Sequence, residues 1–203
     1  MALEHSEDTD MDCGELTGRV VRLTPLEAGQ WRELWRVAEA DGDEIFRWFP
    51  YAMQTEEDFA RWEAKALGEA ARGESRVFVT RDAGGRAIGS TRFMNIDRAN
   101  RRVEIGSTWI ATAWQRTAVN SEAKYLMLRQ AFEGWNCARV ELKTDRLNQR
   151  SRQAILRLGA REEGTLRQHI LTHSGRWRDT VYFSILDAEW PAVKARLEAR
   201  AKE

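Results

Sequence analysis

The sequence has little cysteine and no long apolar run. Only two cysteines, Cys13 and Cys137, occur in 203 residues. They lie in dissimilar contexts, so we expect two thiols and no disulfide framework. No stretch of about 18 apolar residues is present, and no basic segment followed by an apolar one precedes the first strand-like run. These features predict a cytoplasmic protein that does not bind a membrane.

Excess charge of either sign is also missing, because 32 Lys and Arg side chains balance 32 Asp and Glu side chains. Direct binding to nucleic acid is therefore not expected from bulk electrostatics. Positions 1–17 contain several acidic residues but no Lys or Arg, which predicts a disordered acidic tail. Residues 18–203 have a length that suits one domain.

Strand-like and helix-like segments alternate along that domain. Residues 24–27 and 55–58 each have the pattern of a capping box, which predicts that a helix begins there. The predicted elements are a strand at 18–23, helices at 25–40 and 55–72, strands at 75–81, 86–97 and 101–110, a mostly buried helix at 118–135, a strand at 138–145, a helix at 148–159, a hairpin at 162–186 and a final helix from 187. The three consecutive strands are expected to be antiparallel.

The corner between the strand at 101–110 and the next helix contains no acidic residue, glycine or proline. The N-terminus of a helix has unpaired backbone N–H groups and the positive end of the helix dipole, which together favour an anion. A carboxylate in the corner would compete for those donors, whereas Arg116 adds a positive charge. The corner therefore predicts a phosphate site or, as the ordinary alternative, a helix capped by Asn120 or Ser121.

Two further features bear on the ligand. The first favours a ligand with several phosphates, and the second does not decide what the ligand is. Arg146, Arg150 and Arg152 surround the next strand-to-helix corner, and adjacent corners of a sheet commonly bind one ligand. Nine tryptophans occur in the chain, and four of them lie between Trp31 and Trp62. This aromatic stretch is either core or the lining of a pocket.

Four segments in this order resemble the GNAT acetyltransferases, and within them the ribosomal-protein N-terminal acetyltransferases. The segments are "EIGSTWI" followed by "QRTAVN", then "NQRSRQAILRLGA" and "RWRDTVYFSILDAEW". The resemblance extends from Gly18 to Arg196. It implies an α/β (α+β) fold with a mixed, mostly antiparallel sheet that is splayed between its fourth and fifth strands, and with helices on both faces. It also implies acetyl-CoA as co-substrate and no metal.

The resemblance further implies the residues that bind acetyl-CoA. Ala118 and Asn120 stand where the family has small residues in its pyrophosphate loop. Many relatives carry a tyrosine where this chain has Ile155, so Ser151 is the expected hydrogen-bond partner of the sulfur. The implied cofactor-binding residues are Trp109, Ile110, Gln115, Arg116, Thr117, Ala118, Val119, Asn120, Asn148, Ser151 and Arg152.

Acetyl transfer needs a neutral amine, so a carboxylate or a water chain must take its proton. Glu104 is the candidate general base because it alternates in facing with its neighbours in the strand; the alternative is an ion pair with Arg101 or Arg102. Trp35, Trp48, Tyr51 and His169 are the candidate acceptor residues. His169 and His173 share a strand face, but no further metal ligand accompanies them.

The sequence as a whole predicts an N-acetyltransferase that moves an acetyl group from acetyl-CoA to a primary amine, either a protein N-terminus or a small molecule. A homodimer is compatible with this function. The alternative is a sensor or interaction module that binds acyl-CoA without turnover.

Overall fold

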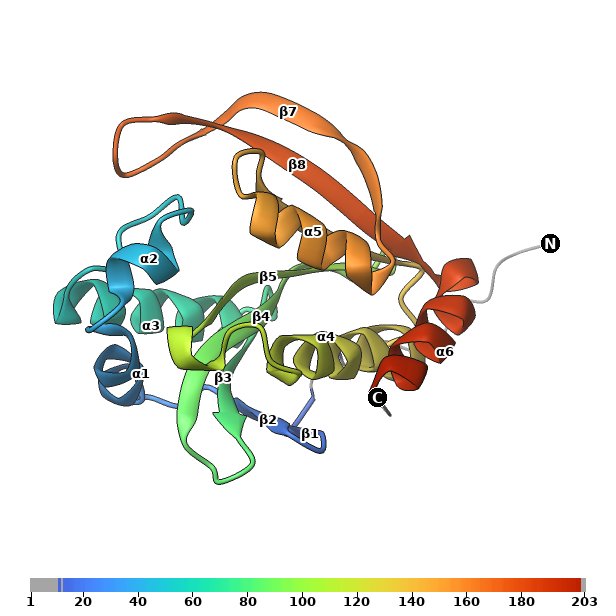
Figure 1. Cartoon of the computed structure of the whole chain (residues 1–203), viewed down its shortest axis with the longest axis horizontal. Helices are drawn as coiled ribbons and strands as arrows, with labels where there is room; N and C mark the ends of the chain where they lie inside the picture. Colours follow the sequence, from blue (N-terminus) through green and yellow to red (C-terminus); the bar gives the residue numbers. More distant parts are fainter. Residues whose placement is uncertain (1–10, 12, 202–203) are drawn as a thin grey trace.

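A computed structural model describes residue 11 and residues 13–201. Eight strands form one sheet in the order β1-β2-β3-β4-β5-β6-β8-β7 (Figure 1). All neighbouring strands are antiparallel except β5 and β6, which are parallel. The strands are β1 Leu16–Thr17, β2 Val21–Pro25, β3 Arg76–Asp82, β4 Ala87–Asp97, β5 Arg102–Ile110, β6 Arg139–Asp145, β7 Arg161–Leu171 and β8 Trp177–Leu186.

Helices cover both faces of this sheet, as the resemblance implied. They are α1 Trp31–Ala38, α2 Gly42–Phe46, α3 Glu56–Ala71, α4 Val119–Arg129, α5 Gln149–Leu158 and α6 Trp190–Arg200. A π-helical turn, Gln130–Gly134, continues α4, and short 3₁₀ turns occur at Thr112–Trp114 and Asp187–Glu189. One apolar core lies between the sheet and α4, α5 and α6, and a second lies between the sheet and α1, α2 and α3. The predicted order of elements is confirmed, with β1 and α2 as additions.

The end of the predicted tail is structured, which corrects the boundary at residue 18. Leu16 pairs with Leu23 in the β1–β2 hairpin, and Met11 is buried in the core. Glu122 of α4 fixes the turn of this hairpin, because its carboxylate accepts hydrogen bonds from the backbone N–H groups of Arg19, Val20 and Val21. Residues 1–10 and 12 of the predicted tail lie outside the described residues.

The predicted start of the first helix at Pro25 was wrong. Thr24 and Pro25 continue β2 and pair with Val79 and Phe78 of β3, so the local capping signal is overridden by pairing with a distant strand. Helix α1 begins only at Trp31. A distant side chain binds its N-terminus, since Glu63 of α3 accepts hydrogen bonds from Gly29 N and Trp31 N at 2.9 and 2.8 Å. The second capping box was correct: Thr55 caps α3 together with Asp58.

Much of the aromatic stretch is core, as the ordinary alternative predicted. Phe46 belongs to the additional helix α2, and its ring lies 5.3 Å from that of Trp109 and 5.7 Å from that of Phe59. Trp62 of α3 is buried in the same core. These contacts fix α2 and α3 against the carboxyl end of β5.

The sheet is splayed between β5 and β6, which are the fourth and fifth of the predicted strands, as the resemblance implied. β5 and β6 pair only from Arg102 to Glu104 and from Arg139 to Glu141, although both strands continue beyond these residues. On its other side β5 stays close to β4, since a Cβ atom on Gly89 would lie 2.2 Å from the carbonyl oxygen of Trp109. The β6-facing edge of β5 beyond Glu104 is therefore without a strand partner.

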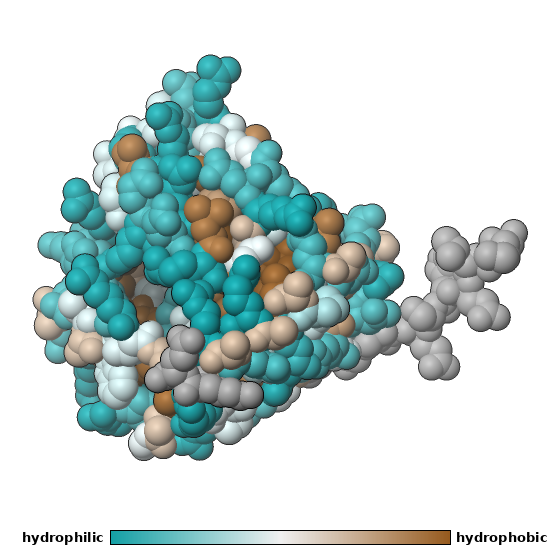
Figure 2. All heavy atoms as spheres, turned by 45° about the vertical axis from the view of Figure 1, so that its right-hand side comes forward, coloured by the Kyte–Doolittle hydropathy of each residue, from teal (hydrophilic) through white to brown (hydrophobic). Residues whose placement is uncertain are grey.

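Within the part of the chain that the structure describes, no helix has the length and hydropathy to span a membrane. On the face drawn in Figure 2, apolar residues form small patches separated by polar ones.

Candidate active site

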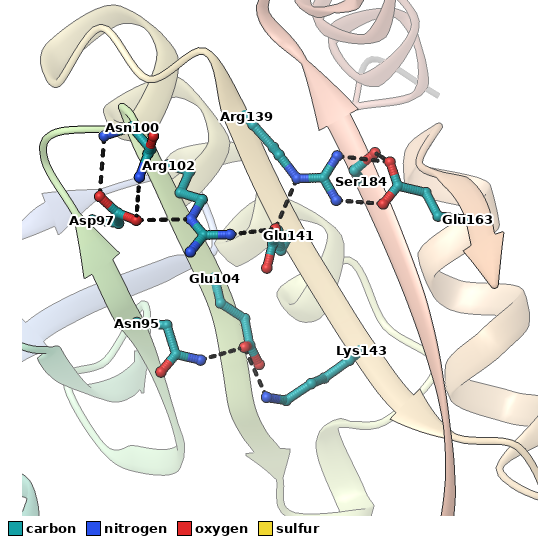
Figure 3. A network of polar contacts seen from close by, with 10 residues as sticks. All are labelled: Asn95, Asp97, Asn100, Arg102, Glu104, Arg139, Glu141, Lys143, Glu163 and Ser184. Carbon is teal, nitrogen blue, oxygen red and sulfur yellow. Dashed lines mark hydrogen bonds and ion pairs between the residues drawn. The ribbon is translucent and has the colours of Figure 1, made fainter. Parts of the chain in front are cut away.

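Glu104 lies on the face of the sheet that α3 covers. Its neighbours Val103 and Ile105 belong to the core on the opposite, α4 face, so the predicted alternation is confirmed. The Glu104 side chain is buried. Its Oε2 accepts a hydrogen bond from Asn95 Nδ2 at 2.7 Å and forms an ion pair with Lys143 Nζ at 2.9 Å (Figure 3). The alternative named the wrong partner, because Arg102 instead pairs with Asp97 and Glu141.

The second oxygen of Glu104 is directed along β5 toward the splay. Oε1 is buried and has no hydrogen-bond partner among the described residues. A Cβ atom on Gly106 would lie 2.9 Å from this oxygen and 3.0 Å from Met94 Sδ. A buried carboxylate oxygen without a donor costs free energy of folding. Its position next to Gly106 makes it available to a donor that enters at the splay.

A bulge in β5 follows Gly106 directly. Ser107 has φ of 49°, and the register shifts between the pairs Arg92–Gly106 and Ser90–Trp109. The Ser107 hydroxyl lies 2.5 Å from the Tyr51 hydroxyl. Burial raises the pKa of Tyr51, with the nearby Arg92 charge acting in the opposite direction. Tyr51, a predicted acceptor residue, thus meets the bulge as a neutral phenol.

The N-terminus of α4 has no side-chain cap from its N-cap residue, Ala118. Neither Asn120 nor Ser121 caps the helix, so the ordinary alternative for this corner was wrong. The Thr117 hydroxyl accepts a hydrogen bond from Val119 N at 3.3 Å. Arg116 is exposed and has φ of 62°. This helix end therefore presents backbone donors and one guanidinium to an anion.

Gln115 connects the same loop to both sides of the splay. Its Nε2 donates to Ile110 O at 2.9 Å, and its Oε1 accepts from Arg150 Nη1 at 2.7 Å. Arg150 follows Asn148, which caps α5 through a hydrogen bond from Ser151 N to Oδ1 at 3.0 Å. Asn148 and Ser151 thus begin α5 beside the loop. Arg152 follows Ser151 directly and pairs with Glu162 of β7 at 3.1 Å.

A hollow of about 230 Å³ brings predicted acceptor and cofactor residues together, since Trp48 and Asn148 both line it. The tip of the β7–β8 hairpin lies above α2 in the view of Figure 1. His173 N donates to Pro50 O at 2.9 Å, and Arg178 Nη1 lies 3.5 Å from Trp48 O. The loop before α3 and the tip of the hairpin therefore form one wall of the site.

Two of the predicted rings pack in or against the core. Trp35 packs edge-on against Phe59 at 5.5 Å, and the Trp109 ring is buried between Phe46 and Phe59. The backbone of Trp109 and Ile110 still forms the edge of the splay. In residue 11 and residues 13–201, no group of His, Cys, Asp or Glu side chains is suited to a metal ion.

His169 lies on the exposed strand β7, with its ring 5.9 Å from that of Tyr182. Tyr182 and Glu104 line a cleft of about 740 Å³ beneath the C-terminal end of α3. Most of the residues that line the cleft are charged or polar, and among them Asp97 and Glu141 pair with arginines (Figure 3). Sequence reasoning missed Tyr182 and Lys143. Lys143 is two residues from Glu141 and Tyr182 is two residues from Ser184, so strand periodicity predicts the face on which each lies. Only the order of the strands in the sheet places these two side chains near Glu104.

Comparison with known proteins agrees with this geometry. Residues 21–161 match the family described as "Acetyltransferase (GNAT) domain". A curated relative, "Putative ribosomal N-acetyltransferase YdaF" of Bacillus subtilis, is 33% identical over 110 residues, which are 54% of this chain and 59% of that protein. The matched segment thus spans less than two thirds of the relative's length.

Solved structures match over almost the whole chain. A GCN5-related N-acetyltransferase from Brucella melitensis is 34% identical with a TM-score of 0.83, covering 93% of this chain and 85% of that one. Mycobacterium smegmatis RimJ, solved in complex with CoA-disulfide, is 25% identical with a TM-score of 0.80, covering 93% of both chains.

The chain therefore belongs to the GNAT acetyltransferase family, whose co-substrate is acetyl-CoA. Two features of this structure fit that molecule. The N-cap residue of α4 makes no side-chain hydrogen bond to the helix, and within the described residues β5 has no strand partner on its β6 side beyond Glu104.

Proposed function

We propose that this protein is an acetyl-CoA-dependent N-acetyltransferase that transfers the acetyl group directly to a primary amine, with Glu104 as general base. One observation carries the proposal: the buried Oε1 of Glu104 has no donor among the described residues and is directed at Gly106, beside the splay. No covalent enzyme intermediate is needed. The amine nitrogen forms a bond to the acetyl carbon, the carbon–sulfur bond breaks, and CoA leaves as the thiol.

Proton removal is the task assigned to Glu104. An unperturbed amine has a pKa of about 8 at a protein N-terminus and about 10.4 on a lysine-like chain, so most of it is protonated at neutral pH. Oε1 accepts that proton, directly or through one water, while Oε2 stays bound to Asn95 and Lys143. These two contacts fix the rotamer of the base.

Backbone groups of the splay supply the electrostatic part of the mechanism. The N–H groups of residues 108–110 belong to the segment of β5 that β6 no longer pairs, and donors there polarise the thioester carbonyl. The Ser151 hydroxyl, at the start of α5, hydrogen-bonds the departing sulfur. Gln115 to Asn120 bind the pyrophosphate through the open end of α4, with Arg116 as counter-charge.

A protein N-terminus is the acceptor that the curated relative favours, because its name is that of a ribosomal N-acetyltransferase. Trp48, which lines the smaller hollow, Tyr51, which contacts the β5 bulge, and His169 beside Tyr182 are the side chains that we propose to contact the acceptor. The protein acts in the cytoplasm in this account, where acetyl-CoA and ribosomes are present.

The test is turnover of acetyl-CoA, followed by thiol release, with a panel of peptides that represent ribosomal-protein N-termini and with polyamines and amino sugars as comparison. Acetylation of at least one peptide α-amine is expected. Binding of acetyl-CoA without turnover of any amine would instead support the sensor function.

A further inference from the structure

Lys124 of α4 is a buried lysine without a carboxylate partner. Its side chain is 6% exposed, and Nζ donates hydrogen bonds to Thr91 Oγ1 at 3.1 Å and to Thr108 Oγ1. The other lysines within the described residues are different. Lys143 and Lys194 bind carboxylates, and Lys65 is largely exposed.

In residue 11 and residues 13–201, no charged group faces Lys124 from the elements that pack around it. Residues of β2 and β5 on this side of the sheet, such as Val21 and Val103, are apolar core. The charged side chains of neighbouring elements bind elsewhere: Arg92 of β4 to Glu69 on the other face, Glu122 of α4 to the β1–β2 turn, Arg22 toward Glu15, Arg196 of α6 to Leu158 O, and Glu198 of α6 to Tyr125. Burial alone lowers the pKa of Lys124 to about 7.

The two hydroxyls that Lys124 binds lie at the β5 bulge. Thr108 follows the bulge residue Ser107, Thr91 lies opposite on β4, and their hydroxyls are 2.8 Å apart. Lys124 is also five residues from Val119, which is about 7.5 Å along a helix axis. The same side chain therefore connects the proposed phosphate-binding end of α4 with the backbone proposed to polarise the thioester.

We propose that Lys124 is a positioning residue that holds the β5 bulge against α4 and takes up a proton when the phosphates of acetyl-CoA bind at the N-terminus of α4. The inference rests on the proposed acetyl-CoA site. A nearby anion stabilises the ammonium form, and by linkage the ammonium form binds the anion more tightly. The affinity for acetyl-CoA is therefore highest below pH 7 and falls by up to about tenfold per pH unit above it.

Calorimetric titration of desulfo-CoA at pH 7.5, in buffers of different ionisation enthalpy, measures this proton directly. The wild-type protein should take up about 0.5 proton more than Lys124→Met, because a group with a pKa near 7 is mostly neutral before binding and mostly charged afterwards. The matched control is Lys65→Met, which removes an exposed lysine of α3 and should retain the wild-type uptake. Equal uptake by Lys124→Met and wild type would overturn the inference.

A second measurement does not depend on the folding of the variant. The second ionisation of a phosphate, with a pKa of about 6, is complete above pH 7. The affinity of the wild-type protein for desulfo-CoA should therefore fall several-fold between pH 7 and pH 8.5, and a constant affinity would overturn the inference. Failure of the wild-type protein to bind at any pH is a separate result, which would remove the proposed function as well.

Discussion

Replacing Glu104 by Gln separates the proton-accepting role of this side chain from its shape. Glutamine keeps an oxygen for Asn95 but cannot take a proton from an ammonium. General-base catalysis contributes roughly 10²- to 10⁴-fold to a rate, so turnover near neutral pH should fall by that factor. The affinity for desulfo-CoA should persist, because Glu104 is not one of the residues proposed to bind the phosphates, which are residues 115–120 at the N-terminus of α4.

The same change has a structural cost that can be worked out separately. It leaves the Lys143 ammonium without its carboxylate. Breaking a fully buried ion pair costs about 3–5 kcal/mol, but the Lys143 side chain is 21% exposed and water can replace part of the interaction, so we expect about 1–3 kcal/mol. Since about 1 kcal/mol shifts the Tm of a domain of this size by about 2–4 °C, assays at 25 °C still measure folded protein.

Glu141→Gln is the matched control for both effects. Glu141 lies directly opposite Glu104 in the parallel register of β5 and β6, lines the same cleft and also pairs with a basic side chain, Arg139, at 2.8 Å. This variant should retain turnover close to that of the wild-type protein in a steady-state thiol-release assay. Equal losses in the two variants, or full activity of Glu104→Gln, would refute the assignment of the base.

Four further outcomes can be checked. Gly106→Ala should lower turnover with little change in desulfo-CoA affinity, since the new Cβ would lie 2.9 Å from Glu104 Oε1; an alanine variant as fast as wild type would contradict the direction given to that oxygen. Asn148→Ala should lose about 1 kcal/mol of stability with the α5 cap, and Asn148→Asp should restore the Tm but not the affinity for CoA; recovery of affinity would make the role purely structural. Hydrogen bonds from a guanidinium and a hydroxyl lower the pKa of Glu163 from 4.5 to about 2, so its stabilisation is complete above pH 4.5 and is lost as the pH falls toward 2. Because the Glu163 side chain is 41% exposed, the loss of stability should be about 1 kcal/mol. Urea unfolding of Glu163→Gln should therefore depend less on pH than that of the wild-type protein in this window. Identical pH profiles for the two proteins would contradict this stabilisation. Burial raises the pKa of Cys137 to about 11, so iodoacetamide at pH 8 should modify it only after denaturation, and rapid labelling of the native thiol would show that the core opens there.

The sequence predicts most of this fold because its signals are local. The capping box at Thr55 is formed by residues three positions apart and needs no other part of the chain. The similar pattern at Thr24 fails because β3 pairs with these residues and Glu63 supplies the real cap of α1. Both partners are more than thirty residues away, so a reading of residues 24–27 cannot include them.

In the candidate site, too, the features that depend on nearby residues were predicted and those that depend on distant residues were not. The carboxylate-free corner at 115–120 and the facing of Glu104 follow from composition and alternation, and both agree with the structure. The contacts of Lys143 with Glu104 and of Lys124 with Thr108 depend on strand order and on helix packing. A lysine in a strand or helix pattern normally indicates an exposed side chain, so the sequence gives no reason to bury either one.

Calorimetric titration of acetyl-CoA into the wild-type protein and into Arg116→Glu measures binding at the proposed phosphate site. We expect micromolar binding to the wild-type protein with one site per chain, and at least tenfold weaker binding by the variant, which has a carboxylate at a corner that otherwise contains none. No binding to the wild-type protein, or equal binding to both, would contradict the assignment of residues 115–120 as the phosphate site.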